Sequence, residues 1–591
     1  MVFMSKTLTS KIDKIKESLV KCGNFLDRHK KVFLTIFFVL VAVRLWLFFA
    51  MNWNIVLESY YDSRLEINSA ISIASGDWGG EYSKFVLCKG LAFPIFLAIL
   101  FWFRMPYGVG LFLITVLASF LFARSLKPVV KNGWLRKIIF LFMLFNPVGL
   151  GGEIAYPYRN ALVPMAVLIV ISCILAIYLR RKAEIKKLLP WGIMGLLFTG
   201  FFWNLREDSI WFLPFIIMGA LIPIGHYWWE HKKKINYKKM IGFSLIALAP
   251  IVGILVWNTG ISIVNKVNYG IYTTQDRTKT YEAKALGALI RIDDGADLEN
   301  DYWVSSEAIE LAKKASPTFR SLKLEPFDRW LKIADYSIWA LRDSVADSGY
   351  YKDAAETDEV YKKIYEELEE GFKNGTLKKK NGFQLSDTSG LYSTNEMLRP
   401  IPTAFHSLIN HAFYNEYEAK LEEIKDVKNE GDIVLYEGIL GTSLLRSEDD
   451  LNRLGADEST RRSNDNLRMT LRINKKISNI IIKIYNVISL VLLLIAFVGV
   501  IIKIITMFKN KNFTDYGVEM LIFVLGILLT ILFNAYTVGL WGTGFELTAD
   551  SPLFKSYTTP QTVMVSVLEV IGVVCLCKSF VKAKKKRERK K

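Results

Sequence analysis

Long apolar runs separated by short polar loops occupy two parts of the chain, before residue 265 and after residue 475. A helix needs about 20 mostly apolar residues to cross the hydrocarbon core of a membrane. Ten runs approach or reach that length, at residues 32–50, 107–123, 136–150, 160–179, 188–204, 210–225, 241–264, 476–507, 518–540 and 560–579. An eleventh run, 91–104, is short and contains Pro94, which favours a juxtamembrane or re-entrant half-helix. The pattern predicts a polytopic α-helical membrane protein with ten spans, or eleven if residues 91–104 also cross.

Residues 265–475 show a different pattern, in which polar and charged positions predominate and apolar positions recur at helical spacing. The stretch TDEVYKKIYEELEEGFKNG places Val360, Ile364 and Leu368 four residues apart, on one face of a helix. About 200 residues are enough for a domain. We therefore expect a mostly α-helical soluble domain inserted between two groups of spans.

The chain carries a formal net charge of +18, and its basic residues gather in loops beside the apolar runs. Such loops normally remain in the cytoplasm. The basic segments are residues 1–31, 124–137, 180–187, 226–239, 509–511 and 580–591. The loops then predicted to face outward are 51–90, 151–159, 205–209, 265–475 and 541–559. We expect a multi-pass protein of the cell membrane, with both termini cytoplasmic and the large domain extracytoplasmic.

This topology divides the chain into five parts. They are a basic cytoplasmic N-terminus (1–31), a transmembrane module with outer loop 51–90 (32–264), an extracytoplasmic domain (265–475), C-terminal transmembrane helices (476–579) and a basic tail (580–591). The basic runs lack interleaved aromatic residues and lie beside spans, which favours membrane lipids over nucleic acid as their partner. The five cysteines form no metal-ligand pattern.

Three of the predicted outer loops carry charged side chains directly beside apolar runs, where charges are costly and so indicate function. The first loop contains Asp62, Glu66 and Lys89, the second contains Arg159, and the third contains Arg206, Glu207 and Asp208. A fold that brought them together would join a carboxylate cluster to several cations. A carboxylate can then take a proton from a hydroxyl as general base, while Arg and Lys bind a phosphate leaving group.

Other interpretations of these loops are open at this point. The aromatic residues Tyr61, Trp78 and Trp211 would stack on a sugar ring or lie in the aromatic belt at the membrane interface. Asp62 would cap the helix that follows it. The adjacent acids of the third loop leave a divalent cation open as a cofactor, and no other cofactor is indicated.

The segments YYDSRLEINSAISIASGDWGGEYSKFVLCKG and NLREDSIWFLP resemble the GT-C superfamily of integral membrane glycosyltransferases, such as protein O-mannosyltransferases and aminoarabinose transferases. More specifically, they look like a bacterial branch in which Tyr-Asp-Asp, Gly-x-Trp, Lys-Gly-Pro and Arg-Glu-Glu-x-x-Trp motifs recur. The resemblance covers residues 1 to about 265, and beyond them only the layout with a large outer domain. Two positions depart from it. Ser63 replaces the second acid of the first motif, and Leu91-Ala92 replaces the proline after Lys89-Gly90.

The resemblance implies that a sugar passes, with inversion, from a polyprenyl-phosphate donor to a cell-envelope glycan, lipid or protein on the outer face. Carried over by position, Asp62 is the base. The resemblance assigns Lys89, Arg159 and Arg206 to the donor phosphate, with Glu66, Glu207 and Asp208 as supporting acids. Two alternatives are a permease or lipid flippase, disfavoured because the spans carry few ionisable residues, and a non-catalytic envelope scaffold, which the Ser63 departure leaves open.

Overall fold

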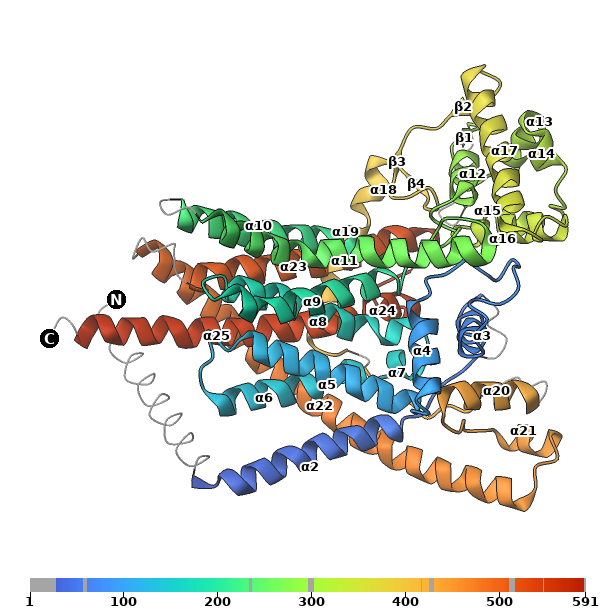
Figure 1. Ribbon diagram of the computed structural model, residues 1–591. Coiled ribbons are helices and arrows are strands. Elements are labelled where there is room, and N and C mark those ends of the chain that lie inside the picture. Colours follow the sequence, from blue (N-terminus) through green and yellow to red (C-terminus); the bar gives the residue numbers. More distant parts are fainter. Residues whose placement is uncertain are drawn as a thin grey trace.

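The computed structural model describes residues 28–56, 61–232, 236–295, 302–415, 417–424, 430–509, 516–545 and 547–588. Most of the regular structure in these residues is helical, and each strand has only two residues. A bundle of long helices forms the larger part, and a smaller domain lies beyond one end of it (Figure 1). We call this end the domain end. The opposite end, which carries the Lys/Arg-rich connections, is the basic end.

Ten helices of the described residues make up the bundle. They are α2 (Lys30–Phe49), α5 (Tyr107–Ser125), α6 (Gly133–Leu144), α8 (Val163–Leu179), α9 (Ile185–Trp203), α10 (Leu213–His231), α11 (Tyr237–Tyr269), α22 (Glu458–Lys509), α23 (Tyr516–Gly542) and α25 (Pro560–Glu588). Every residue of α8 is buried, because α5, α9, α10, α11 and α25 all pack against it. A helix that is apolar on all sides, as α8 is, belongs at the centre of such a bundle.

Short helices cover the domain end of the bundle. They are α3 (Ser63–Ala74), α4 (Ala92–Trp102), α7 (Gly152–Ala155), α18 (Thr394–Leu398), α19 (Pro400–Ala412), α20 (Glu430–Leu440), α21 (Glu448–Arg453) and α24 (Pro552–Thr558). The 3-10 turns are η1 (Pro147–Gly149), η2 (Arg159–Ala161), η3 (Ser209–Phe212) and η4 (Thr543–Phe545). Helix α4 has 11 residues, too few to cross a membrane, and lies across the ends of the bundle helices (Figure 1). This agrees with the half-helix predicted at residues 91–104.

Among the described residues, eight helices are long and apolar enough to cross a membrane. A ninth span results if α24 and α25, which meet at a bend of 52°, are counted as one. The chain is therefore a helical membrane protein, but the count is below the ten spans predicted. The predicted run 136–150 accounts for the difference, because α6 has only 12 residues. Which end faces the cytoplasm stays a prediction from the basic loops.

Helix α6 ends inside the bundle, where side chains from other helices bind carbonyl groups of its last turn and of η1, which follows it. Arg44 of α2, which is fully buried, donates from Nε to the carbonyl of Leu144 over 2.8 Å and from Nη2 to that of Gly149 over 2.9 Å. The Tyr485 hydroxyl of α22 donates to the carbonyl of Phe142 over 2.6 Å. Because hydrocarbon offers no water to such groups, these bonds allow the helix to stop where it does.

The domain beyond the bundle consists of residues 281–392 and has its own hydrophobic core. Its elements are α12 (Tyr281–Ile290), β1 (Ile292–Asp293), α13 (Ser306–Ala315), α14 (Pro317–Arg320), α15 (Asp328–Lys332), α16 (Tyr336–Asp347), α17 (Ala354–Lys373), β2 (Lys378–Lys379), β3 (Phe383–Gln384) and β4 (Leu391–Tyr392). Strand β1 pairs antiparallel with β2, and β3 with β4. The core includes Leu286 and Leu341 together with Ile364 and Leu368 of α17, the helix predicted from their four-residue spacing.

Residues 394–475 return to the bundle instead of extending the domain. Helix α19 packs against α23, and α20 packs against α3 and α4. Tyr414 and Tyr417 form a hydrophobic cluster with Ile482 and Tyr485 of α22. The segment predicted as one soluble domain therefore contains a separate domain and a second part that packs with the spans.

Replacing Arg44 with methionine keeps a long side chain but removes the donors to two buried carbonyl groups. We expect the melting temperature of the detergent-solubilised protein to fall, because each buried acceptor left without a donor costs about 1–3 kcal/mol. Thermal unfolding followed by tryptophan fluorescence measures the change, with Arg124→Met at the exposed end of α5 as control. A melting temperature equal to that of the wild type would contradict the role given to Arg44.

Candidate functional site

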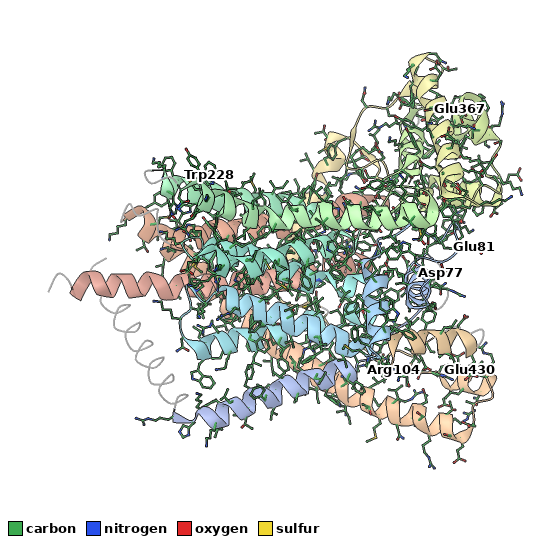
Figure 2. The ribbon with its side chains drawn as sticks, in the orientation of Figure 1. Asp77, Glu81, Arg104, Trp228, Glu367 and Glu430 are labelled. Carbon is green, nitrogen blue, oxygen red and sulfur yellow. The ribbon has the colours of Figure 1, made fainter. Side chains whose placement is uncertain are left out.

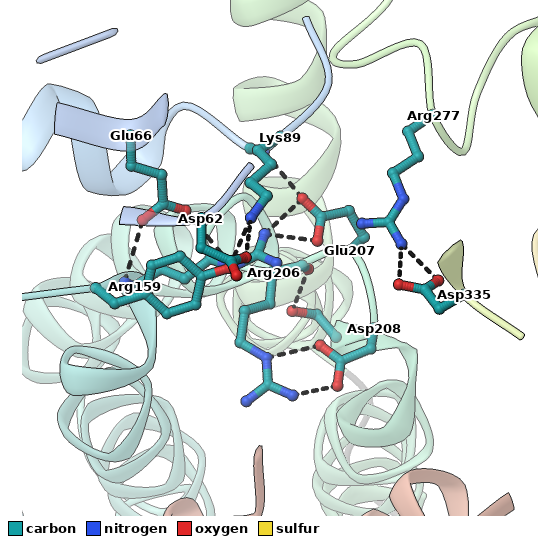
Figure 3. A network of polar contacts seen from close by, with 12 residues as sticks. Asp62, Glu66, Lys89, Arg159, Arg206, Glu207, Asp208, Arg277 and Asp335 are labelled. Carbon is teal, nitrogen blue, oxygen red and sulfur yellow. Dashed lines mark hydrogen bonds and ion pairs between the residues drawn. The ribbon is translucent and has the colours of Figure 1, made fainter. Parts of the chain in front are cut away.

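Asp62 lies at the start of α3 and remains accessible while two buried groups bind it (Figure 3). Its side chain is 55% exposed. Lys89 donates from Nζ to Asp62 Oδ1 over 2.8 Å, and the Tyr158 hydroxyl donates to the same oxygen over 3.2 Å. Asp62 occupies the N-cap position, but its side chain makes no capping hydrogen bond, so the helix-cap interpretation is wrong.

The Lys89-Gly90 pair connects α3 to α4 and packs against the turn between α9 and η3. Lys89 is only 3% exposed. The N–H of Gly90 donates to Glu207 Oε1 over 3.1 Å, and a Cβ at Gly90 would lie 2.3 Å from the carbonyl oxygen of Asn204. Glycine is therefore needed for the two backbones to approach so closely, and this approach places Lys89 beside Asp62.

Arg159, the first residue of η2, is the buried centre of the cluster (Figure 3). Its Nη1 lies 2.6 Å from both carboxylate oxygens of Glu207. Its backbone N–H donates to Glu66 Oε2 over 3.3 Å, and its Nε lies 3.5 Å from Glu66 Oε1. Arg159 is 2% exposed and Glu66 is fully buried. Three loops that the sequence predicts on one side of the membrane thus meet on a single guanidinium group.

Arg206 and Asp208 form a second pair, on the side of the cluster that faces α24 (Figure 3). Arg206 Nε donates to Asp208 Oδ1 over 2.8 Å, and a second bond joins its Nη2 to Oδ2. The Nη1 of Arg206 donates to the carbonyl of Tyr557 over 3.2 Å, and the guanidinium carbon lies 4.3 Å from the centre of the Tyr557 ring. These bonds of Arg206 go to Asp208 and α24, next to the Arg159 centre.

The charges of the cluster shift the pKa values of its acids in opposite directions. Partial dehydration raises the pKa of Asp62, but the Lys89 ammonium and the Arg159 guanidinium together hold it below its ordinary value. Burial also opposes ionisation of Glu207, yet the Arg159 guanidinium lowers its pKa to about 2. For Glu66, burial outweighs the nearby cations and raises the pKa to about 7. At neutral pH Asp62 and Glu207 are therefore carboxylates, whereas Glu66 can take up a proton.

Arg277 and Trp339, two residues missed by the sequence analysis, close the cluster from the side of the domain. Arg277 binds both carboxylate oxygens of Asp335 at 2.6 Å, and its guanidinium carbon lies 4.7 Å from the centre of the Trp339 ring. Lys89 Nζ lies 5.8 Å from the same ring. Arg277 lies shortly after the end of α11, so its charge beside a span could have identified it as a candidate from the sequence. Trp339 offered none, because its place depends on how the domain docks.

Arg342 of α16 joins the domain to the first outer loop. This arginine is fully buried and donates to the carbonyls of Lys84 and Val86 over 2.6 and 2.8 Å. It also forms ion pairs with Asp276 and Glu282. One side chain of the domain therefore fixes the backbone that leads to the Lys-Gly pair.

The neighbouring face of α16 contacts Tyr61, which lies earlier in the same outer loop. Asp343 accepts a hydrogen bond from the Tyr61 hydroxyl, and the ring of Trp339 lies 4.7 Å from that of Tyr61. Directly after Val86, the loop holds Leu87 at a φ of 61°, a left-handed conformation that is strained for leucine. Such strain persists where surrounding contacts impose it, and here it lies two residues before Lys89.

A cavity of about 230 Å³ between the bundle and the domain adjoins the cluster. Its lining includes Arg159, Glu207, Arg277, Lys279, Trp541 and Tyr557. Lys279 is exposed and makes no ion pair within the described chain. The Nε of Arg277 has no hydrogen-bond partner there either. The cavity thus offers uncommitted cationic donors to an anionic group.

An apolar groove of about 400 Å³ lies between α8, α10 and α23. Trp211 and Phe533 line it nearest the domain end, and Ile210 and Thr537 line the cationic cavity, so the two spaces adjoin along η3 and α23. Together they fit a molecule with an anionic head and a long apolar tail.

The three aromatic residues singled out by sequence lie in different places. Tyr61 packs on Trp339 beside the accessible carboxylate. The Nε1 of Trp78 donates to Asn265 Oδ1 of α11 over 2.7 Å, so this ring anchors the outer loop to the bundle. Trp211 is 1% exposed and lines the apolar groove.

The acidic pair Glu207 and Asp208 does not converge on one point, because the two carboxylates bind different arginines. Within the described residues, no group of three or more His, Cys, Asp or Glu side chains gathers as a metal site. No protein-family model and no curated protein matches the chain. The resemblance to the GT-C superfamily stays a prediction from the quoted segments.

Replacing Arg342 with methionine frees the first outer loop and leaves the buried Glu282 carboxylate without a cation. We expect a lower melting temperature, because breaking a buried ion pair costs about 3–5 kcal/mol. Adding Glu282→Gln should recover part of this loss, since a neutral amide needs no countercharge. Differential scanning calorimetry measures the three proteins, and Arg320→Met, at an exposed position of the same domain, is the control. Equal stability of Arg342→Met and wild type would refute the docking role.

Proposed function

We propose that the protein is a membrane glycosyltransferase that moves a sugar from a polyprenyl-phosphate donor to a hydroxyl group of a cell-envelope acceptor. One observation carries the proposal. An accessible carboxylate, Asp62, lies beside a buried cationic cluster. The cluster adjoins a cavity, and the cavity in turn adjoins an apolar groove. Base, phosphate site and lipid site are the three parts that this reaction needs.

Asp62 is the general base in this proposal because of its access and its charge. A base must reach the hydroxyl whose proton it removes, and Asp62 is more exposed than Glu66, Glu207 or Asp208. Glu66, with its higher pKa, has the greater proton affinity but is fully buried against Arg159. The ion pair with Lys89 keeps Asp62 ionised and orients it. The small side chain of Ser63, where the family pattern has a second acid, is fully buried and would not face the acceptor.

The transfer is a single in-line displacement. The acceptor oxygen forms a bond to the anomeric carbon of the sugar as the bond from that carbon to the phosphate oxygen breaks, and the configuration inverts. The acceptor proton goes to Asp62, and the electron pair of the broken bond goes to the phosphate. Arg159, Arg277 and Lys279 line the cavity where this negative charge grows.

The apolar groove is the proposed place of the polyprenyl chain. It lies within the part of the bundle that crosses the membrane, so a lipid can enter it from the bilayer. Its lining is almost entirely apolar, with Phe215, Met218 and Phe523 among its members. Each methylene buried there contributes about 0.8 kcal/mol.

A second candidate, movement of a polyprenyl lipid across the membrane, is favoured by the length of the groove. Its lining extends to Tyr178 near the basic end, close to the ion pair between Arg181 and Glu519. The two candidates differ in their product. A glycosyltransferase forms a new covalent glycoside, whereas a transporter leaves the lipid unchanged.

Replacing Asp62 with asparagine should abolish transfer at unchanged expression, because an amide cannot accept the proton. Loss of a general base lowers the rate by about 10² to 10⁴-fold. The assay is transfer of radiolabelled sugar from a polyprenyl-phosphate sugar by purified protein in liposomes. Asp77→Asn, the same change at an exposed position of the same loop, is the control. Full activity of Asp62→Asn would remove Asp62 as the base.

Filling the apolar groove should weaken the use of long-chain donors. At Gly526 an added Cβ meets only Phe215 at ordinary contact distance, so Gly526→Phe places its ring in the groove without an initial clash. We expect the KM for a long polyprenyl donor to rise at least about tenfold, the effect of losing 1.4 kcal/mol of binding. A short-chain soluble donor should be unaffected. The control is Leu525→Phe, on the exposed side of the same helix, and equal KM values in both variants would place the lipid elsewhere.

A further inference from the structure

A second cavity, of about 250 Å³, lies between α3 and the loop that follows it, outside the cluster described above. Its lining includes Arg64, Asn68, Ser69, Ser72, Glu81 and Phe85. Figure 2 shows Glu81 beyond the domain end of the bundle, between the domain and helices α20 to α22. The cavity is therefore reached from the aqueous side of the bundle rather than from the lipid.

Four polar side chains of this cavity are left to bind water or a ligand. Asn68, Ser69, Ser72 and Glu81 make no side-chain hydrogen bond or ion pair with any described residue. A helical serine commonly bonds back to the carbonyl four residues earlier, as Ser344 does over 2.8 Å. Ser69 and Ser72 make no such bond, so their hydroxyl groups are available to a ligand.

Gly79 and Gly80 contribute a stretch of backbone, held in a fixed shape, to the loop side of the cavity. Gly80 has a φ of +86°, and a Cβ there would lie 3.1 Å from Ser72 Oγ. A Cβ at Gly79 would lie 2.6 Å from the hydroxyl oxygen of Tyr269. That hydroxyl accepts from the N–H of Gly79 over 3.0 Å and donates to the carbonyl of Gly80 over 3.1 Å. Gly80 thus leaves the space beside Ser72 open, and Gly79 allows the close contact with Tyr269 through which α11 fixes the loop.

The cavity also adjoins the accessible carboxylate. Phe85, 37% exposed, lines the cavity and packs on the ring of Tyr61 at 5.5 Å. Tyr61 directly precedes Asp62, and Arg64, two residues beyond Asp62, lines the same cavity. A ligand that fills this space has one end near the proposed base.

We propose that this cavity binds a saccharide unit of the acceptor. Hydroxyl and amide groups without partners, one exposed aromatic ring and open backbone match the hydroxyl groups and apolar ring faces of a sugar. Arg64, the one cationic residue among the described residues of the lining, is paired with Asp432 of α20 at 3.6 Å, so no unpaired cation of these residues faces the cavity, which favours a neutral sugar over an anion. The role as acceptor subsite rests on the proposed glycosyltransferase function, whereas saccharide binding itself does not.

Saccharide binding is tested directly by saturation-transfer difference NMR on the full-length protein in lipid nanodiscs. The probes are the methyl glycosides of glucose, galactose and N-acetylglucosamine, with no donor present. Ser69→Leu fills the cavity, and Asn68→Ala removes one amide. Ser75→Leu, at the exposed end of α3 and outside the cavity lining, is the matched control. Thermal unfolding of each variant establishes that it is folded.

We expect a signal for at least one glycoside with wild type and Ser75→Leu, no signal with Ser69→Leu, and a signal reduced at least threefold with Asn68→Ala. No signal with wild type, or a signal that survives both cavity variants, would overturn the proposal. In the transfer assay, Ser69→Leu should raise the acceptor KM at least about tenfold and leave the donor KM unchanged. If Ser69→Leu removes saccharide binding but the wild type transfers no sugar from any polyprenyl-phosphate donor, the saccharide site stands and the glycosyltransferase function is rejected.

Discussion

The pairing of one buried guanidinium group, that of Arg159, determines how the domain end of the bundle is built. A charge removed from water costs several kcal/mol unless it is paired and hydrogen-bonded. Arg159 is paired with Glu66 and Glu207, acids that lie 93 and 48 residues away in the chain. The two loops must therefore close over it. Glu207 in turn accepts a hydrogen bond from the N–H of Gly90, and this contact brings Lys89 to Asp62, the most exposed acid of the cluster.

Much of the bundle could be predicted because the requirement for an apolar span is local. Hydropathy placed each of the eight long helices, and the helical spacing of Ile364 and Leu368 identified α17. The predicted span at residues 136–150 is too short a helix to cross, for a reason that no local pattern contains. Helix α6 stops inside the bundle where Arg44, about a hundred residues earlier, and Tyr485, more than three hundred residues later, bind its last carbonyls. The return of residues 394–475 to the bundle is likewise a matter of tertiary packing.

The sequence could predict those residues of the site that lie in the loops between spans. Charges beside spans on one predicted side pointed to Asp62, Lys89, Arg159 and Glu207, and the structure brings these four together. Their partners from the domain were not predictable, because no sequence spacing indicates that α16 docks on the first outer loop. That docking places Trp339 within reach of two cations of the cluster. The domain thus completes the site as well as covering it.

In the function proposed here, the cationic cavity and the apolar groove together bind a polyprenyl lipid through its phosphate. Native mass spectrometry of the purified protein, with polyprenyl monophosphate and uncharged polyprenol of equal chain length in competition, measures this directly. We expect the monophosphate to bind at least about tenfold more tightly, a difference of 1.4 kcal/mol or more. Equal occupancy by the two lipids would contradict it, because the cations would then contribute nothing to binding.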